Sequence, residues 1–453
     1  MLYVTYSPSL SNIFHAGTVV MIVDQFNTTL SGGAAVAAKR LHHALLESGI
    51  SSRLFYLQQK QRQTVQDESY LPAHSAWSSR GLTPRMWSRK QLQRLKFKHA
   101  LRGRPPGLEM FSCPEVLPHT QIDVANLGTD IIQLHWVAKL IDYASFFASI
   151  PSDFPIVWTL HDMNPFTGGC HYSGNCTAYY DECQNCPQLG RQRSNDLSWQ
   201  FFNQKLAAIE GKNIHIVAPS HWLENEARKS RIFANAQSFQ TIHNGLDTDI
   251  FKPYDKKLAR HTLGIQKEGL IIGFGAESLE NHRKGFQELL KALPQLATTQ
   301  CITGLAFGVG TIDESLPGIP DIVTTGYVND PKKQALIYSA ADIFVMPSLE
   351  DNLPQTGLEA LACGTPVVAF ETGGVPDYVH HHKTGLLAKT GDTTHLAHQI
   401  DYLADRPQER RRMAENGRAL VINEFHHRHQ AAKYISLYRN LLAAKFNNSL
   451  HAA

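Results

Sequence analysis

The sequence predicts an α/β protein built from two doubly wound domains that face each other across a central cleft. Short β-branched runs alternate with helical patterns almost throughout the chain, which is typical of parallel sheets. The length of 453 residues exceeds one ordinary core. Turn and breaker residues separate two such series at residues 243–257. We therefore expect domains at 18–250 and 254–425, and a terminal helix at 426–446 that closes the second domain or crosses back to the first.

The first domain is expected to begin with a buried strand and an amphipathic helix. The run TVVMIVDQF is continuously apolar, as strands covered on both faces are. In the helix that follows, one face carries Ala37, Leu41, Ala44 and Leu45, and Gly49 supplies a stop. The strand runs of this half begin at Thr18, Ser52, Asp130, Ile156, Asn213 and Phe239. Residues 1–17 receive no structural role.

The second domain repeats this alternation. Its strand runs begin at Leu270, Thr303, Asp321, Asp342 and Pro366. Ligands of such sheets bind outside the carboxyl ends of the strands, so functional motifs should follow the strands directly.

The composition excludes several classes of protein. Hydrophobic residues make up 43% of the chain and charged residues 18%, a globular balance. The net charge of +3 does not by itself require a polyanionic partner. No stretch reaches the about 18 apolar residues of a membrane span, and the N-terminus lacks the pattern of a secretion signal. These observations predict a cytoplasmic protein.

The most informative stretch is PSLEDNLPQTGLEALACGTPVVAFETGG, residues 347–374. A helix is expected from about Pro354, with Asp351 or Asn352 as its cap. A helix N-terminus at the end of a strand binds anions, and Glu359 further along can accept hydrogen bonds from both hydroxyls of a ribose. Taken alone, Asp351 could equally be only a cap and Glu359 only a solvated helix residue.

The spacing Asp351-x7-Glu359 followed by ALACGTPVVA resembles the signature of the large retaining glycosyltransferase family of the GT-B fold, family 4. Other segments match in the same order. They are APSHWL from Ala218, HNGLDTDIFKP from His243, FGAESLENHRKGFQELLKAL from Phe274 and YSAADIFVMPS from Tyr338. The resemblance covers about residues 18–425. It implies a GT-B fold of two Rossmann-like domains and a nucleotide-diphosphate sugar, with UDP or GDP, as donor.

The resemblance also implies roles for donor-side residues. Glu359 would bind the ribose, and Lys284, aided by Arg283, would neutralise the diphosphate. Backbone amides around Asn352 and Leu353 would hold the donor sugar.

Two departures from the family pattern affect this site. The residue expected to contact the sugar hydroxyls is usually Glu and is Asp351 here. The arginine that the family often carries near Glu277 is missing, so Arg283 is expected to take its place.

On the acceptor side, Ser31-Gly32-Gly33 lies between the first strand and its helix. Glycines let backbone approach a ligand closely, and the resemblance places Gly32 and Gly33 against the donor phosphate; a plain turn is the alternative. His161 occupies a family position near the donor sugar, and His135 ends a neighbouring strand. In a chain of 23 histidines each is also an ordinary core or surface candidate.

The resemblance implies transfer with retention, to a glycan or lipid-linked acceptor. No matched first-domain carboxylate is an obvious nucleophile. Asp162 is the nearest, although a capping role suits it better, so front-face substitution is favoured. Lys284, Arg283 and helix amides would stabilise the leaving diphosphate, His161 and Asp351 would line the reacting sugar, and no metal would be required. A nucleotide-sugar epimerase or hydrolase and a non-enzymatic binding module are the alternatives.

Four cysteines crowd one loop with the spacing C-x5-C-x6-C-x2-C. Cys170, Cys176, Cys183 and Cys186 predict either a structural zinc or reduced, packed thiols in a reducing compartment. The loop resembles a branch of the family linked to bacterial exopolysaccharide synthesis and is expected to shape the acceptor pocket.

Residues 80–104 are basic and contain no acid. Trp87 and Phe97 are interleaved with the basic residues, and Trp77 precedes the segment. They predict either peripheral contact with anionic lipids at the inner face of a membrane or a solvated loop. Nucleic-acid binding is disfavoured because no binding module accompanies the charge. The basic residues are Arg80, Arg85, Arg89, Lys90, Arg94, Lys96, Lys98, Arg102 and Arg104.

Overall fold

The computed structural model describes residues 21–57, 67–73, 84–102, 104–105, 107–115, 127–190, 193–266, 268–312 and 317–452. Residues 1–17, the expected strand start at Thr18, and residues 80–83 and 103 of the basic segment lie outside these ranges. The side chains of residues 84–87 and 89–90 are not described either.

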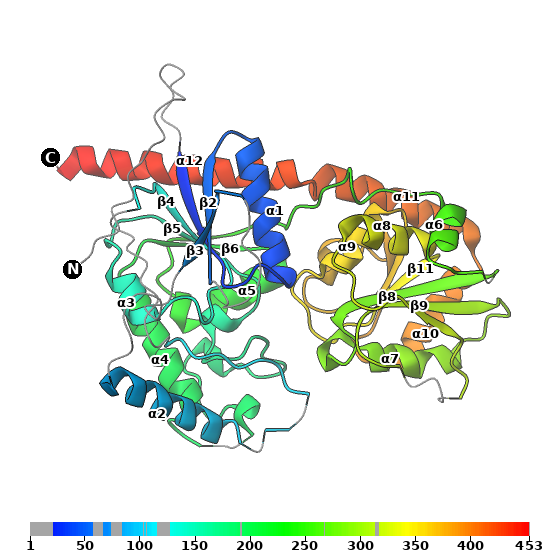
Figure 1. Ribbon diagram of the computed structural model, residues 1–453, viewed down its shortest axis with the longest axis horizontal. Helices are drawn as coiled ribbons and strands as arrows, with labels where there is room; N and C mark the ends of the chain where they lie inside the picture. The colour runs from blue at the N-terminus through cyan, green and yellow to red at the C-terminus, as the bar shows by residue number, and fades with distance from the viewer. Residues whose placement is uncertain are drawn as a thin grey trace.

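Two parallel sheets, each covered by helices, form the two domains (Figure 1). The strand order is β3-β2-β1-β4-β5-β6-β7 in the first sheet and β10-β9-β8-β11-β12-β13 in the second. The first sheet contains β1 (Ile22–Phe26), β2 (Ser51–Leu57), β3 (Tyr70–Ala73), β4 (Ile131–Leu134), β5 (Ile156–Thr159), β6 (Ile214–Ala218) and β7 (Ser238–Thr241). The second contains β8 (Leu270–Ser278), β9 (Ile302–Val309), β10 (Ile322–Thr324), β11 (Ile343–Met346), β12 (Val367–Phe370) and β13 (Gly385–Ala388). The predicted α/β class is confirmed.

The helices follow the strands in the alternation expected of such sheets. The first domain contains α1 (Gly33–Glu47), α2 (Pro84–Ala100), α3 (Tyr143–Ala148), α4 (Leu197–Ile209) and α5 (His221–Lys229). The second contains α6 (Lys256–Thr262), α7 (Phe286–Ala292), α8 (Pro331–Ala340), α9 (Gln355–Ala362), α10 (Thr393–Ala404) and α11 (Pro407–Glu424), and α12 (His427–Ala452) ends the chain. The predicted stripe of α1 is buried as expected, and Gly49 follows that helix with a φ of 79°.

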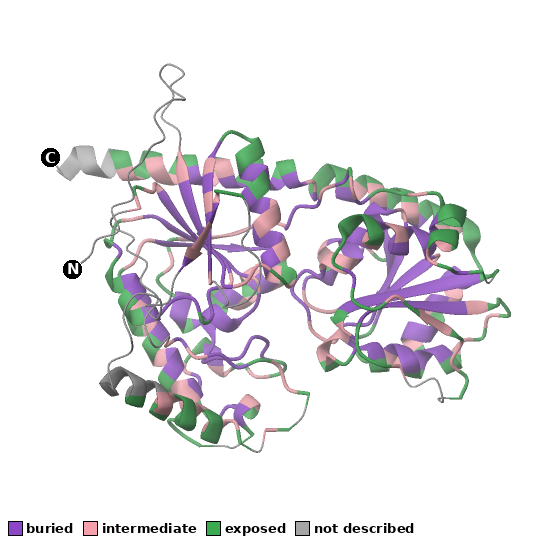
Figure 2. Cartoon of the chain, in the orientation of Figure 1, coloured by how far each residue is buried: buried purple, intermediate pink, exposed green. Residues whose placement is uncertain are grey.

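The central strands of both sheets are buried, whereas the edge strands β7 and β10 are not (Figure 2). Buried apolar side chains form the cores that pack against the sheets. All residues of β4, β5 and β6 are buried, which explains their continuous apolar sequence. Each strand run named from the sequence lies on an observed strand. Two short strands, β3 and β13, were not predicted.

The C-terminal residues form two successive helices, and the second of them overlaps the expected terminal helix at 426–446. They cross from the second domain to the first: α11 packs on α9 of the second domain, and α12 packs on α1 of the first. Buried Tyr434 and Tyr438 of α12 face the first sheet, where they bond Thr159 Oγ1 at 2.6 Å and Gln133 Oε1 at 2.8 Å.

The chain passes between the domains at two adjacent places. Leu246, on the way into the second domain, forms an isolated parallel bridge with His426, on the way back. Leu246 N donates to Phe425 O at 2.7 Å, and His427 N donates to Leu246 O at 3.1 Å. We call Leu246 and residues 425–427 the double crossing.

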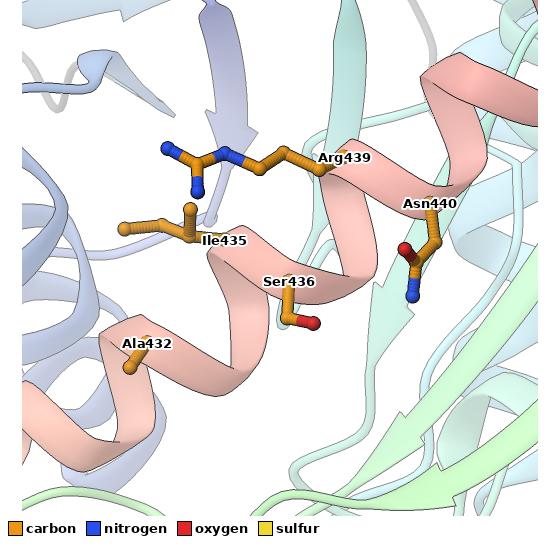
Figure 3. A pocket seen from close by; sticks show the side chains of 5 residues that line it. All are labelled: Ala432, Ile435, Ser436, Arg439 and Asn440. Carbon is orange, nitrogen blue, oxygen red and sulfur yellow. The ribbon is translucent and has the colours of Figure 1, made fainter.

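On the side of α12 away from Tyr434 and Tyr438 there is a shallow hollow. It is lined by Ala432, Ile435, Ser436, Arg439 and Asn440 (Figure 3). All five belong to that one helix, and none is among the predicted site residues. Within the described ranges, no helix is both long and apolar enough to cross a membrane.

Candidate functional site

The loop that follows β11 lies at the domain boundary and leads into α9. Helix α9 begins at Gln355 with Pro354 at the cap position and no side-chain cap. The expectation that Asp351 or Asn352 caps this helix is therefore wrong, because Asp351 Oδ1 accepts the neighbouring Asn352 N–H at 3.1 Å instead. The loop is packed tightly, since a Cβ on Gly373 would lie 1.7 Å from Asp351 O.

Two cations bracket the Asp351 carboxylate. Lys284 Nζ lies 2.6 Å from Oδ2, and Arg283 Nη1 lies 3.2 Å from Oδ1. Burial by itself raises the pKa of Asp351, but Lys284 and Arg283 outweigh that effect and hold the pKa below its usual value. The turn that positions both cations needs Gly285, whose φ is 72° and whose Cβ would meet Pro347 O at 1.8 Å.

Arg283 also reaches the first domain. Its Nε lies 2.9 Å from Glu109 Oε1, and its Cζ lies 4.0 Å from the centre of the Tyr172 ring. Its Nη1 donates to Glu350 O at 2.8 Å. The predicted diphosphate cations are thus assembled at the boundary by residues of both domains.

Glu359 is a buried carboxylate on α9, with only 5% of its surface exposed. Tyr338 Oη donates to Oε2 at 2.8 Å. Arg40 of α1 lies 2.8 Å from Oε1 through Nη2, and its Nη1 donates to Gln355 Oε1 at 2.8 Å. The predicted ribose ligand is therefore not a solvated helix residue, and it is paired with a residue of the other domain that the sequence did not indicate.

The neighbours of Asp351 in the loop contact the first domain. Asn352 Oδ1 accepts from Ser220 Oγ at 2.7 Å, and its Nδ2 donates to His161 O at 3.2 Å. Ser220 also caps α5 by accepting from Leu223 N at 3.2 Å. Leu353 is buried in the core of the second domain.

The predicted glycine loop opens α1 on the opposite side of the boundary. Gly32 occupies the cap position with a φ of 89°, and Gly33 begins the helix. A Cβ on Gly32 would lie 3.7 Å from Glu277 Oε2 of the second domain. The loop therefore faces the segment that, by resemblance, lacks the family arginine.

His135 is buried and His161 is half-buried, and the two form a pair whose tautomers follow from their partners. His135 Nε2 lies 2.8 Å from the acceptor Gln25 Oε1, so it carries the proton. His135 Nδ1 must then accept, at 3.0 Å, from His161 Nε2. Burial lowers the pKa of His161 to about 4 and that of His135 well below its usual value. The pair is neutral at neutral pH and leaves His161 Nδ1 as an acceptor.

Asp162 is held by donors on every side. Trp136 Nε1 donates to Oδ2 at 2.9 Å, His171 Nδ1 lies 2.6 Å from the same oxygen, and Asn164 N donates to Oδ1 at 2.9 Å. Burial raises the pKa of Asp162, and His171 is foremost among the groups that lower it overall. This arrangement suits a positioning role better than a nucleophile.

The four cysteines are free thiols in this structure. Burial raises the pKa of Cys183 to about 12 and that of Cys186 to about 11. Sulfur atoms on one zinc would lie within roughly 4 Å of one another. In the described part of the chain no three of these cysteines bring their sulfur atoms within 4.8 Å of each other. Zinc at this loop stays a prediction and requires the sulfur atoms to move together.

Among the described residues, one group of three metal-ligating side chains does have its ligand atoms within 4.8 Å of one another: His221, His243 and Asp377. His221 N and Nδ1 both contact Asp377 Oδ2, at 2.9 and 3.0 Å. His243 Nδ1 donates to Pro219 O at 2.8 Å. These hydrogen bonds account for the group as a contact between the domains.

Most of the described part of the basic segment is helix α2, and Arg102 and Arg104 follow it. Phe97 faces inward, with its ring 6.4 Å from that of Phe111 and 6.3 Å from that of Phe201. Leu92 and Leu95 point outward and are 53% and 64% exposed. Basic residues therefore alternate with exposed leucines on the outer surface of α2.

Known proteins share this architecture. Residues 256–420 match the family model described as Glycosyl transferases group 1. Sucrose-phosphate synthase from Thermosynechococcus elongatus has a TM-score of 0.66 at 20% identity, covering 94% of this chain and 100% of that one. Anabaena HepE in complex with UDP has a TM-score of 0.62 at 16% identity, covering 93% and 100%. The fold is therefore GT-B, as predicted.

A curated relative matches over a shorter length. D-inositol 3-phosphate glycosyltransferase of Segniliparus rotundus is 29% identical over 195 residues, which cover 41% of this chain and 43% of that protein. The aligned part thus spans less than half the length of the relative. The match to the family model, at residues 256–420, lies in the second domain.

Proposed function

We propose that the protein is a retaining glycosyltransferase that moves a sugar from a UDP- or GDP-sugar to a glycan or lipid-linked acceptor. One observation carries the proposal. A buried carboxylate, Glu359, and two cations, Lys284 and Arg283, lie along one boundary between two GT-B domains. A ribose needs the carboxylate, and a diphosphate needs the cations. The match of residues 256–420 to group 1 glycosyl transferases supports the same reading.

The proposed chemistry is front-face substitution. The bond between the anomeric carbon and the phosphate oxygen breaks, the acceptor oxygen bonds that carbon on the same face, and the departing phosphate takes the acceptor proton. Lys284 and Arg283 stabilise the charge that develops on the leaving diphosphate. His161, neutral at neutral pH, offers hydrogen bonding beside the sugar without adding charge.

Asp351 has a modified part in this proposal. Its carboxylate already holds Lys284 and Arg283, so it fixes the two cations in place. The backbone amides beside it, at Asn352 and Leu353, are left to bind the sugar hydroxyls. Asp162, with its oxygens occupied, orients the first-domain wall of the cleft.

The proposed acceptor and pathway rest on the cysteine loop and on helix α2. The cysteine loop resembles an exopolysaccharide branch, and the exposed leucines and cations of α2 suit an anionic lipid surface. We therefore propose action at the cytoplasmic face of a membrane, on a growing surface polysaccharide.

The test is a donor screen on the full chain. Binding and slow hydrolysis of UDP- and GDP-sugars are measured for wild type, Glu359→Ala and Lys284→Ala, with Lys291→Ala as control. Lys291 is an exposed lysine of the same domain, paired with Glu288 at 2.8 Å. We expect one donor to bind selectively. Glu359→Ala should abolish that binding. Lys284→Ala should weaken the binding of nucleoside diphosphates roughly tenfold or more and leave the binding of the nucleoside unchanged.

If Glu359→Ala binds the donor as tightly as the wild type does, the donor-site assignment is contradicted. A bound donor that is epimerised or hydrolysed at full rate, with transfer to no glycan acceptor, would favour the alternative enzyme class on this fold.

A further inference from the structure

A single arginine of the first domain spans two positions of helix α9. Arg40 reaches Gln355 through Nη1 and Glu359 through Nη2, each at 2.8 Å. The two partners are four residues apart and so share one helical face. The planar guanidinium bonds the two acceptors through two different nitrogens in a fixed geometry, whereas the ammonium of a lysine would have to bond both from a single nitrogen. The Cζ atom of Arg40 also lies 5.3 Å from the centre of the Phe251 ring, on the segment between the domains.

The pair is largely withdrawn from solvent. The side chain of Arg40 is 15% exposed and that of Glu359 is 6% exposed. Removing one member of a buried ion pair leaves the other uncompensated. Tyr338 of the second domain bonds Oε2 in any arrangement of the domains, whereas Arg40 holds Oε1 only while α1 lies against α9.

The hydrogen bonds of Glu359 do not use all the lone pairs of its carboxylate oxygens. Arg40 occupies one lone pair of Oε1 and Tyr338 one lone pair of Oε2. Each carboxylate oxygen has two lone pairs, so one stays free on each. Two free acceptor positions on neighbouring oxygens are what the 2′- and 3′-hydroxyls of a ribose require. A bound ribose and Arg40 can thus share the carboxylate.

We propose that Arg40 is a positioning residue for the nucleotide ribose, which holds the Glu359 carboxylate from across the domain boundary. The inference rests on the donor role proposed for Glu359 and deepens it. Ribose recognition by the second domain then depends on a residue of the first. A nucleotide is bound fully only when the domains meet.

The experiment compares a nucleotide with its 2′-deoxy form. Calorimetry on the full chain measures the Kd of UDP and dUDP, and of GDP and dGDP, for wild type, Arg40→Ala and Arg40→Lys. Arg260→Ala is the matched control, because Arg260 forms a similar pair with Asp342 at 2.6 Å and is 19% exposed, but within the second domain alone. Thermal melts verify that each variant is folded.

We expect wild type to prefer the ribonucleotide by about tenfold or more, the scale of a hydrogen bond to a charged group. Arg40→Ala should weaken the binding of the ribonucleotide by about the same factor and that of the deoxynucleotide much less. The ratio of the two Kd values should therefore fall towards one. Arg40→Lys should retain only part of the preference, and Arg260→Ala all of it.

Equal weakening of both nucleotides in Arg40→Ala would overturn the inference, because a purely structural arginine affects both alike. An unchanged preference, or no preference in wild type, would overturn it as well. In each of these outcomes the wild type still binds a nucleotide, so the proposed function stands. Failure of wild type to bind either UDP or GDP would instead overturn the proposed function.

Discussion

Ser220 Oγ donates a 2.7 Å hydrogen bond to Asn352 Oδ1, which joins the start of α5 in the first domain to the donor-side loop of the second. Both residues are buried. Gly374 lies beside this bond, because a Cβ there would meet Asn352 O at 1.9 Å and Ser220 Cβ at 2.5 Å. The domain boundary is thus packed as closely as a core at this point.

Gly374→Ala should therefore separate the domains locally without unfolding either. The added methyl has no room on either side of the boundary, and a misplacement of about 1 Å can cost roughly a hundredfold in rate. We expect transfer to fall by about that factor, measured as kcat with the donor found in the screen. Gly417→Ala is the control, since the three atoms nearest to its Cβ would all belong to the Leu361 side chain of the second domain, the nearest at 2.7 Å. Equal losses in both variants would contradict this prediction.

His42 should make stability depend on pH. Burial is foremost in lowering its pKa from 6.5 to about 4, so the unfolded chain binds the proton more readily. The stabilising contribution is complete above pH 6.5 and is lost as pH falls towards 4, to a total on the order of 3 kcal/mol. Urea unfolding between pH 7.5 and roughly 4.5 should show the loss, with a shallower slope in His42→Gln. The exposed His398→Gln should keep the wild-type slope, and an identical slope in both variants would refute the assignment.

Tyr438→Phe should destabilise the first domain although Tyr438 belongs to the last helix. Its hydroxyl donates to Gln133 Oε1 at 2.8 Å in a fully buried setting. Phenylalanine would leave that oxygen without its donor, at a cost of about 1–3 kcal/mol. Urea unfolding measures the change. Tyr327→Phe, at a residue 52% exposed, should cost almost nothing. A loss equally small in Tyr438→Phe would show that water replaces the hydroxyl.

Helix α2 should bind anionic vesicles. Exposed Leu92 and Leu95 can enter the headgroup region while Arg94 and Lys96 pair with lipid phosphates. We expect co-sedimentation with phosphatidylglycerol vesicles that weakens with added salt, and with the double change Leu92→Ser and Leu95→Ser. Leu258→Ser, on an equally exposed leucine of α6, is the control. If the double change leaves co-sedimentation unaffected, the outer surface of α2 is solvent-exposed and does not contact the lipid.

Metal analysis tests the cysteine loop. If the loop binds zinc, the purified chain contains about one zinc, and Cys183→Ser releases it. Cys301→Ser, at an exposed cysteine outside the loop, should leave the zinc content unchanged. If the protein contains no metal and its loop thiols react only after unfolding, the sulfur atoms serve as packing. The burial that raises the pKa of Cys183 and of Cys186 agrees with that outcome.

The fold was predictable wherever a strand was a continuous β-branched run. IVWTL and PVVAF are recognisable as buried strands because both of their faces are covered. The strand Tyr70–Ala73 contains a proline, and Gly385–Ala388 is short and begins with glycine. Their edge positions tolerate such residues. No run of apolar residues long enough to be recognised marked either strand.

The site was predictable in its residue types and not in its pairings. Glu359, Lys284 and Asp351 stood out by spacing and resemblance. Arg40 lies in an ordinary amphipathic helix more than 300 residues away from Glu359. No local pattern marks such a partner, because the contact exists only once two separately folded domains meet.

The double crossing restricts how the two domains can move. Leu246 and residues 425–427 are bonded side by side, so the polypeptide enters and leaves the second domain through one narrow ribbon. A pair of bonded strands bends and twists far more easily than it stretches. The relative motion is then a swing about a fixed pivot. Contacts beside the pivot, such as the 3.7 Å approach of His243 Nδ1 to Asp377 Oδ2, would persist during a swing. Contacts farther from the pivot would separate, so a ligand held between the domains would be released.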